Sequence, residues 1–140
     1  MAADHPPKRP DRRSDARERA LYLLYEAQAK GISPSDALDL QIVEPDEMTA
    51  LLVRGVDEHR ARLDEAIAAR ATGWALDRMP VLDLNVLRLG AFELAERTEV
   101  PVAVVIDEAV ELAKRFSTDN SGRFVNGVLA ALATDLRPPG

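Results

Sequence analysis

The chain of 140 residues contains no cysteine, has only 4% aromatic residues and holds no apolar run long enough to cross a membrane. Without cysteine it can form no disulfide, no thiolate nucleophile and no thiolate metal site, which fits a reducing compartment. The N-terminus carries basic residues, but no apolar core follows them as it would in a secretion signal. We therefore expect a soluble protein that remains in the cytoplasm.

Sequence motifs of the common enzyme and cofactor sites are also missing. The chain has no glycine-rich phosphate loop, no serine elbow and no dinucleotide fingerprint. His5 lies near the N-terminus and His59 on an apolar helical seam, so a packing role is expected for His59 rather than metal binding. Asp107 and Glu111 lie one helical turn apart, but no third polar group converges with them. The sequence thus predicts a protein that is not an enzyme and needs no cofactor or metal.

The formal net charge of -6 argues against general affinity for nucleic acid, but the charges are unevenly distributed. Residues 1–19 contain six basic and four acidic side chains, a local balance of +2, whereas the remainder has 12 basic and 20 acidic side chains, a balance of -8. A short basic arm on an acidic body can reach phosphates locally while the body repels non-specific binding. A solvated tail without a ligand explains the same pattern equally well.

Apolar residues recur at helical spacing along most of the chain, and prolines and glycines separate the helical patterns. No segment alternates with the two-residue period of a strand between hairpin turns. We expect an all-α fold of about six or seven helices. The clearest patterns cover residues 15–30, 34–40, 45–72, 81–95 and 102–116, with a final apolar stripe from 124 to 132.

Individual residues carry expectations about helix ends and packing. Ser14 offers an N-cap for the first helix, which leaves residues 1–13 as a separate arm. Arg17 and Tyr25 are expected near a shared outer side of that helix. Arg88 lies in a helix that is apolar almost all round, so it needs a carboxylate or carbonyl partner. Gly127 lies inside the last apolar stripe, where glycine costs roughly 1 kcal/mol relative to alanine, so we expect a close helix-helix approach there.

Four segments of the chain resemble, in the right order, the NusB family of bacterial transcription antitermination factors. They read RERALYLLYEAQ from residue 17, LVRGV from 52, WALDRMPVLDLNVLRLGAFEL from 74, and EAVELAKRF followed by a short polar loop and RFVNGVL over 108–129. The resemblance implies a NusB-like domain over 14–140, compact and built from two small packed helical bundles, with a flexible basic arm over 1–13.

The resemblance also implies a function. NusB-like proteins bind the boxA element of leader RNA, especially in ribosomal RNA operons, together with NusE, a small-subunit ribosomal protein. The pair tethers nascent RNA to an elongating RNA polymerase and suppresses termination. We expect the RNA to be recognised as a single strand, because the edges of an A-form duplex are hard to read from a helix bundle.

The family's contact residues are carried over by motif. The resemblance places RNA contacts at two regions and a NusE contact just before the Leu87–Arg88 pair. The implied RNA-binding residues are Arg12, Arg13, Arg17, Tyr25, Lys114, Arg123 and Phe124, and the implied partner-binding residue is Asp83. The chain departs from the family pattern at Ser14 and Asp15, which stand where arginine usually continues the arm, so RNA affinity is expected to be lower.

Two other interpretations use the same residues differently. In the first, the chain is a protein-interaction or dimerisation module, and a NusE-type partner supplies most RNA contacts. In the second, it is the NusB-like domain that is fused to some ribosomal RNA methyltransferases, but the sequence has no Rossmann segment to bind a methyl donor. We expect a homodimer whether the protein is an antitermination factor or an interaction module. Tyr22 is expected to serve in helix packing.

Overall fold

The structure, a computed structural model, describes residues 12–137, and this part of the chain contains helices and no strand. It confirms the predicted all-α fold. The helices are α1 (Arg12–Lys30), α2 (Pro34–Asp39), α3 (Glu47–Arg70), the short 3-10 helix η2 (Leu76–Arg78), α4 (Val81–Glu96), α5 (Val102–Phe116) and α6 (Asp119–Leu136). None of these helices combines the length and the apolar character that a membrane crossing requires.

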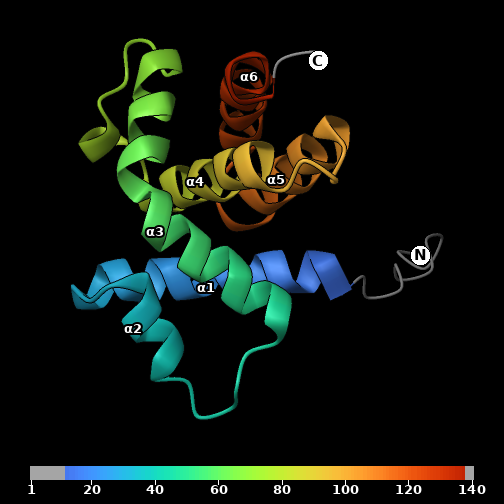
Figure 1. Cartoon of the computed structure of the whole chain (residues 1–140). Helices are drawn as coiled ribbons and strands as arrows, with labels where there is room; N and C mark the ends of the chain where they lie inside the picture. The colour runs from blue at the N-terminus through green and yellow to red at the C-terminus, as the bar shows by residue number, and fades with distance from the viewer. Residues whose placement is uncertain (1–11, 138–140) are drawn as a thin grey trace, which may run out of the picture.

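Two groups of three helices form the body of the protein (Figure 1). Helices α1, α2 and α3 contact one another, and helices α4, α5 and α6 do the same. The two groups join where α3 and α1 pack against α4. Helix α3 belongs to both groups, because its 24 residues extend for about 36 Å. The arrangement confirms the expected pair of small packed bundles.

Local side-chain chemistry accounts for several helix ends. Ser33 accepts a hydrogen bond from a first-turn amide of α2, Asp46 does so for α3, and Thr118 does so for α6. Pro34 occupies the first turn of α2, where no amide hydrogen is needed. Gly31 follows α1 with φ of 68°, a left-handed conformation that favours glycine and stops the helix.

Helix α4 lies at the centre of the protein and is buried from residue 83 to residue 94. Arg88 in this helix forks onto the two carboxylate oxygens of Asp64 on α3, at 2.7 and 3.0 Å. This pair confirms the predicted need for a carboxylate partner. The ring of His59 stacks on Phe92 with centroids 6.0 Å apart, which is the packing role expected for this histidine.

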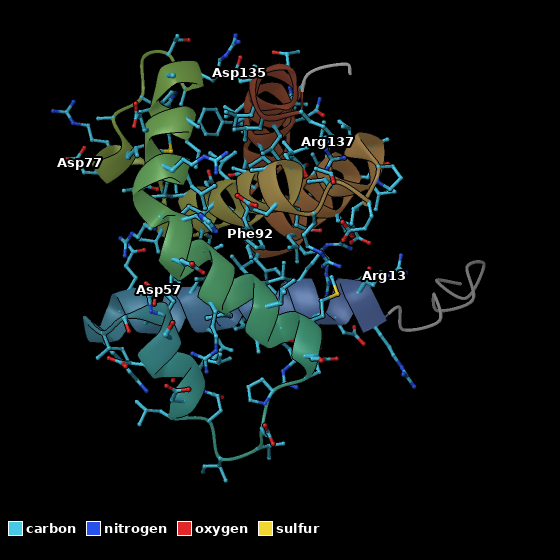
Figure 2. All side chains as sticks on the ribbon, viewed as in Figure 1. Arg13, Asp57, Asp77, Phe92, Asp135 and Arg137 are labelled. Carbon is cyan, nitrogen blue, oxygen red and sulfur yellow. The ribbon has the colours of Figure 1, made fainter. Side chains whose placement is uncertain are left out.

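Glycines allow close approach between helices at two crossings of α4. Gly55 of α3 lies directly under the Phe92 ring, which sits where α3 crosses α4 (Figure 2), and a β-carbon there would overlap the ring. At Gly90 a β-carbon would lie 2.8 Å from Leu129 of α6. The prediction for Gly127 was wrong: this glycine is exposed, and no neighbouring group in the part of the chain that the structure describes lies within 4 Å of the β-carbon position. Its spacing placed it inside the apolar stripe, but that turn of α6 faces outward.

The start of α1 also differs from the prediction. The helix begins at Arg12 rather than Asp15, because arginine is a good helix former and Ser14 is not used as a cap. The Ser14 hydroxyl instead donates to the Glu108 carboxylate of α5 at 2.6 Å. Arg12 and Arg13 are therefore part of a helix, and the rest of the predicted arm, residues 1–11, lies outside the described residues.

Candidate nucleic-acid interface

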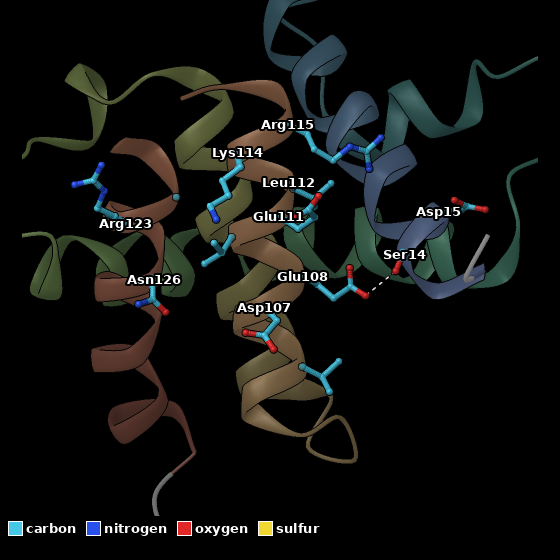
Figure 3. A pocket seen from close by; sticks show the side chains of 13 residues that line it. Ser14, Asp15, Asp107, Glu108, Glu111, Leu112, Lys114, Arg115, Arg123 and Asn126 are labelled. Atoms are coloured by element: carbon cyan, nitrogen blue, oxygen red, sulfur yellow. Dashed lines mark hydrogen bonds between the residues drawn. The ribbon is translucent and has the colours of Figure 1, made fainter. Parts of the chain in front are cut away.

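A groove of about 870 Å³ runs between the first turn of α1, the length of α5 and the first turns of α6 (Figure 3). Helix α1 contributes Ser14 and Asp15 to its lining, and α6 contributes Gly122, Arg123 and Asn126. Residues that are far apart in the sequence thus share one concave surface. Of the residues to which the resemblance assigned RNA contacts, Lys114 and Arg123 line the groove, and Arg12 and Arg13 immediately precede its first lining residue, Ser14.

Charge within the groove changes along α5. The first ten residues of the helix include Asp107, Glu108 and Glu111, and its last turn presents Lys114 and Arg115. Cations in a last turn also interact favourably with the helix dipole. A polyanion is therefore attracted to the C-terminal end of α5 and repelled by the acidic residues that precede it.

Lys114 is held across the groove by the absence of a side chain at Gly122. A β-carbon at Gly122 would lie 2.9 Å from Lys114 Cγ and 3.4 Å from Cε, so the lysine stem rests on the bare backbone of α6. Figure 3 shows Lys114 pointing from α5 toward α6, with Arg123 extending away from α5. These two exposed cations form the basic end of the groove. Sequence reasoning missed Gly122, because residues 117–122 were predicted to form a polar loop, whereas α6 already begins at Asp119.

Arg115 is engaged in a contact between the two bundles. Its guanidinium lies 2.7 Å from the Glu18 carboxylate of α1 and 5.1 Å from the centre of the Phe116 ring. Tyr22 meets the same ring edge-on, with centroids 5.4 Å apart, in keeping with its expected packing role. This cluster fixes the end of α5 against α1, so the position of the groove's basic end depends on α1.

Arg17 does not lie on the outer side of α1, where we expected it. Arg17 is 3% exposed, and its side chain forks onto Glu93 of α4, at 2.6 and 2.9 Å. A second carboxylate, Glu108, lies 3.5 Å from its Nη1 atom. Tyr25 is 47% exposed, because eight residues of helix rotate it by about 80° from Arg17. The spacing alone therefore did not place the two side chains on one face.

The remaining predicted cations and Phe124 occupy different faces. Arg12 and Arg13 are exposed in the first turn of α1, next to the groove, and Figure 2 labels Arg13 there. Tyr25 lies more than three turns further along α1 and does not line the groove. Phe124 is half-buried and packs partly against the core. The structure thus brings Lys114 and Arg123 together, places Arg12 and Arg13 nearby, and separates Tyr25 and Phe124 from the groove itself.

Trp74, which the sequence analysis did not assign to the site, contacts the ring of Phe124. The two ring centroids are 5.8 Å apart with the planes inclined by 54°, and Trp74 is 51% exposed. A signal was present in the sequence, because Trp74 is the only tryptophan and follows a Thr-Gly turn signal.

Asp83 lies beneath the surface in the first turn of α4 and is 4% exposed. Its Oδ2 atom accepts a hydrogen bond from the Ser121 hydroxyl at 2.9 Å, and its Oδ1 atom is buried without a hydrogen-bond donor from residues 12–137. The Ser121 hydroxyl oxygen is itself 3.1 Å from the hydroxyl oxygen of Thr118, the N-cap of α6. The carboxylate thus anchors the first turn of the helix that carries Arg123 and Phe124.

Comparison with known proteins places this arrangement in a family. A family model described as the NusB family matches residues 14–134. The chain is 50% identical over 134 residues to the transcription antitermination protein NusB of Anaeromyxobacter dehalogenans, covering 91% of this chain and 94% of that one. It is 48% identical over 124 residues to the NusB protein of a Nocardioides species, covering 86% and 92%.

Solved structures agree with these relatives. The structure of NusB from T. maritima superposes with a TM-score of 0.83 at 33% identity, covering 91% of this chain and 94% of that one. A crystal structure of the antitermination factors NusB and NusE in complex with dsRNA superposes with a TM-score of 0.76 at 27% identity, covering 88% and 96%. The family match, the relatives and the fold coincide, and this chain therefore belongs to the NusB family.

Proposed function

We propose that this protein is a transcription antitermination factor that binds boxA-type leader RNA of ribosomal RNA operons together with NusE. In this role it tethers the nascent RNA to an elongating RNA polymerase. The observation that carries the proposal is the basic end of the groove, where Lys114 and Arg123 are exposed on a protein of net charge -6. Family membership over most of the chain supports it, as do relatives that are antitermination proteins.

The residues of the surface divide by chemistry. Arg12, Arg13, Lys114 and Arg123 are exposed cations suited to phosphate contacts. Tyr25 and Phe124 offer aromatic faces on which unpaired bases stack. Arg17 supports the site from inside, because a direct phosphate contact would require its pair with Glu93 to break. These roles predict that Arg17 variants lose RNA affinity in proportion to their loss of folding.

The partner contact at Asp83 is proposed in the same way. Because the carboxylate is buried under the first turn of α6, a NusE-type protein reaches it only if that turn shifts. A basic group of the partner would then satisfy the Oδ1 atom. The contact would couple partner binding to the helix that carries Arg123, a reason for RNA and NusE to bind together.

The proposed role is regulatory and requires no catalytic step. It is carried out where bacterial transcription takes place, in the cytoplasm. We also propose that the free protein forms a homodimer.

A second candidate function is a protein-interaction module whose partner supplies most RNA contacts. The acidic half of the groove favours it, because Asp107, Glu108 and Glu111 would attract a basic partner and repel RNA. The two functions differ in whether the isolated protein itself discriminates between RNA sequences.

The deciding experiment is a binding assay with a leader RNA that contains boxA and with a scrambled RNA of equal length and composition. Each RNA is titrated with and without NusE, as a single strand and as a duplex. We expect preference for single-stranded boxA, enhanced by NusE. Preference that appears only with NusE supports the interaction module. Equal affinity for both RNAs in both conditions contradicts the antitermination assignment.

A further inference from the structure

Trp74 is held in a defined turn after α3. Ala71 ends α3 and is buried, and Gly73 turns the chain with φ of 83°. The Trp74 amide donates to the Ala71 carbonyl oxygen at 3.1 Å, and η2 follows directly, with the side chain of Leu76 packed against the core. The position of the indole is therefore set by anchored backbone on both sides.

Half of the indole faces outward in this turn. Trp74 is 51% exposed although it contacts Phe124, and its ring N–H makes no hydrogen bond within the part of the chain that the structure describes. A tryptophan is large enough to be highly buried on average, so a fixed and half-exposed one needs a reason. Packing on Phe124 uses part of the ring and leaves the rest available to a ligand.

The aromatic pair continues the surface of the groove. Arg123, which lines the basic end of the groove, immediately precedes Phe124 on α6. Gly127, one turn after Arg123, is exposed and presents bare helix backbone, and no neighbouring group of residues 12–137 lies within 4 Å of its β-carbon position. A strand whose phosphate lies at Arg123 would have a neighbouring base within reach of the rings.

We propose that Trp74 is a base-stacking residue of the RNA site and that, together with Phe124, it receives one unpaired nucleobase beyond the basic end of the groove. This inference rests on the proposed RNA-binding function and adds a position to it. Stacking on an indole tolerates any base, because every base has a π-face, so Trp74 contributes affinity more than sequence choice. The exposed ring N–H can donate to an edge of the same or a neighbouring nucleotide.

Because Trp74 is the only tryptophan of the chain, its fluorescence reports on this contact directly. The full chain is titrated with single-stranded boxA RNA while tryptophan emission is recorded, and affinity is measured separately from the anisotropy of labelled RNA. A set of RNAs with one abasic position each identifies the stacked base. Trp74→Ala and Trp74→Phe are compared with Leu51→Ala, whose side chain is 48% exposed on α3.

We expect saturable quenching with the same midpoint as the anisotropy. One abasic RNA should bind without quenching. Trp74→Ala should lower affinity on the order of tenfold, whereas Trp74→Phe and Leu51→Ala should remain close to the unmodified protein. The quenching and the abasic series use the unmodified protein, so they test stacking even if the alanine variant folds poorly.

Specific boxA binding without any change in emission, and with unchanged affinity in Trp74→Ala, would overturn the inference and leave the proposed function in place. Quenching that no abasic position relieves would also overturn it, because a change of the loop rather than stacking would then be the cause. Equal binding of boxA and scrambled RNA would overturn both proposals.

Discussion

Replacing Arg17 with alanine removes the positive member of an ion pair that lies inside the protein. The Arg17 and Glu93 side chains are 4% and 3% exposed, and the guanidinium makes two hydrogen bonds to the carboxylate, at 2.6 and 2.9 Å. In Arg17→Ala the Glu93 carboxylate remains buried without this partner. Glu108 also loses a contact at 3.5 Å, but its side chain is 24% exposed and keeps the Ser14 hydroxyl.

The size of the effect follows from this difference in burial. Breaking a buried ion pair by removing one partner costs about 3–5 kcal/mol, mostly from the uncompensated charge that remains. A domain of this size has a free energy of unfolding of about 5–15 kcal/mol, so the variant should lose roughly a fifth or more of its stability. At about 3–4 °C per kcal/mol, the melting temperature should fall by roughly 10 °C or more.

The assay is urea denaturation at neutral pH followed by circular dichroism. Arg54→Ala is the matched control, because Arg54 pairs with Asp39 at 2.7 Å while both side chains are more than half exposed. This surface pair should contribute only about 0–1 kcal/mol. Replacing Arg17 with methionine and Glu93 with leucine together should recover most of the lost stability, since no buried charge is then left unpaired.

The double variant also separates support from direct contact. If Arg17 acts by positioning α1 against α4 and α5, the folded double variant should bind RNA with nearly unchanged affinity. A loss of stability in Arg17→Ala no larger than in Arg54→Ala would refute the energetic reasoning. Lost RNA affinity in a stable double variant would show that Arg17 contacts RNA itself.

Three further predictions concern stability and are measured by chemical denaturation. Gly55→Ala should destabilise by about 1–2 kcal/mol, because overlap with Phe92 outweighs the gain in helix propensity, and Phe92→Leu in the same chain should relieve it. Partial burial raises the pKa of Asp46 and hydrogen bonds from Thr49 lower it, and the net shift is downward. The contribution of Asp46 to the free energy of unfolding is therefore present above the unfolded carboxyl pKa of about 3.9 and is lost as pH falls through the folded pKa. Asp46→Asn, which keeps the N-cap, should therefore lose less stability than the unmodified protein between about pH 5 and about pH 3. Arg137 donates to four backbone carbonyl groups around the α4–α5 connection, so Arg137→Ala should cost roughly 1–3 kcal/mol and Arg137→Lys less.

The helices could be predicted because their apolar spacing and their end residues are visible in short segments of the sequence. The α5 pattern begins after Pro101 and ends before Ser117, and the observed helix has the predicted bounds of residues 102–116. Gly31 and Pro34 likewise mark the end of α1 and the start of α2. Apolar spacing and the glycines and prolines at helix ends are properties of short segments, so they can be recognised without knowing which helices pack together.

Side-chain placement depends on neighbours that the local pattern does not contain. Arg17 is buried because helices of both bundles pack against α1. A position that would face solvent on a helix covered on one side only therefore meets Glu93 instead. Gly127 and Gly55 both interrupt helices, but only Gly55 lies at a crossing. The contribution of Trp74 depends on its contact with Phe124, fifty residues later, which no spacing reveals.

The proposed contacts of Lys114 and Arg123 with the phosphates of a single-stranded RNA can be counted through the salt dependence of binding. The affinity for boxA RNA is measured over a range of salt concentrations for the unmodified protein and for Lys114→Ala combined with Arg123→Ala. A control variant removes two exposed arginines of α3 in the same way, Arg54 and Arg62. With about 0.7 per single-strand phosphate contact, the slope of log affinity against log salt should become shallower by about 1.4 in the first variant and stay unchanged in the control. An identical slope in all three proteins would show that Lys114 and Arg123 make no phosphate contact.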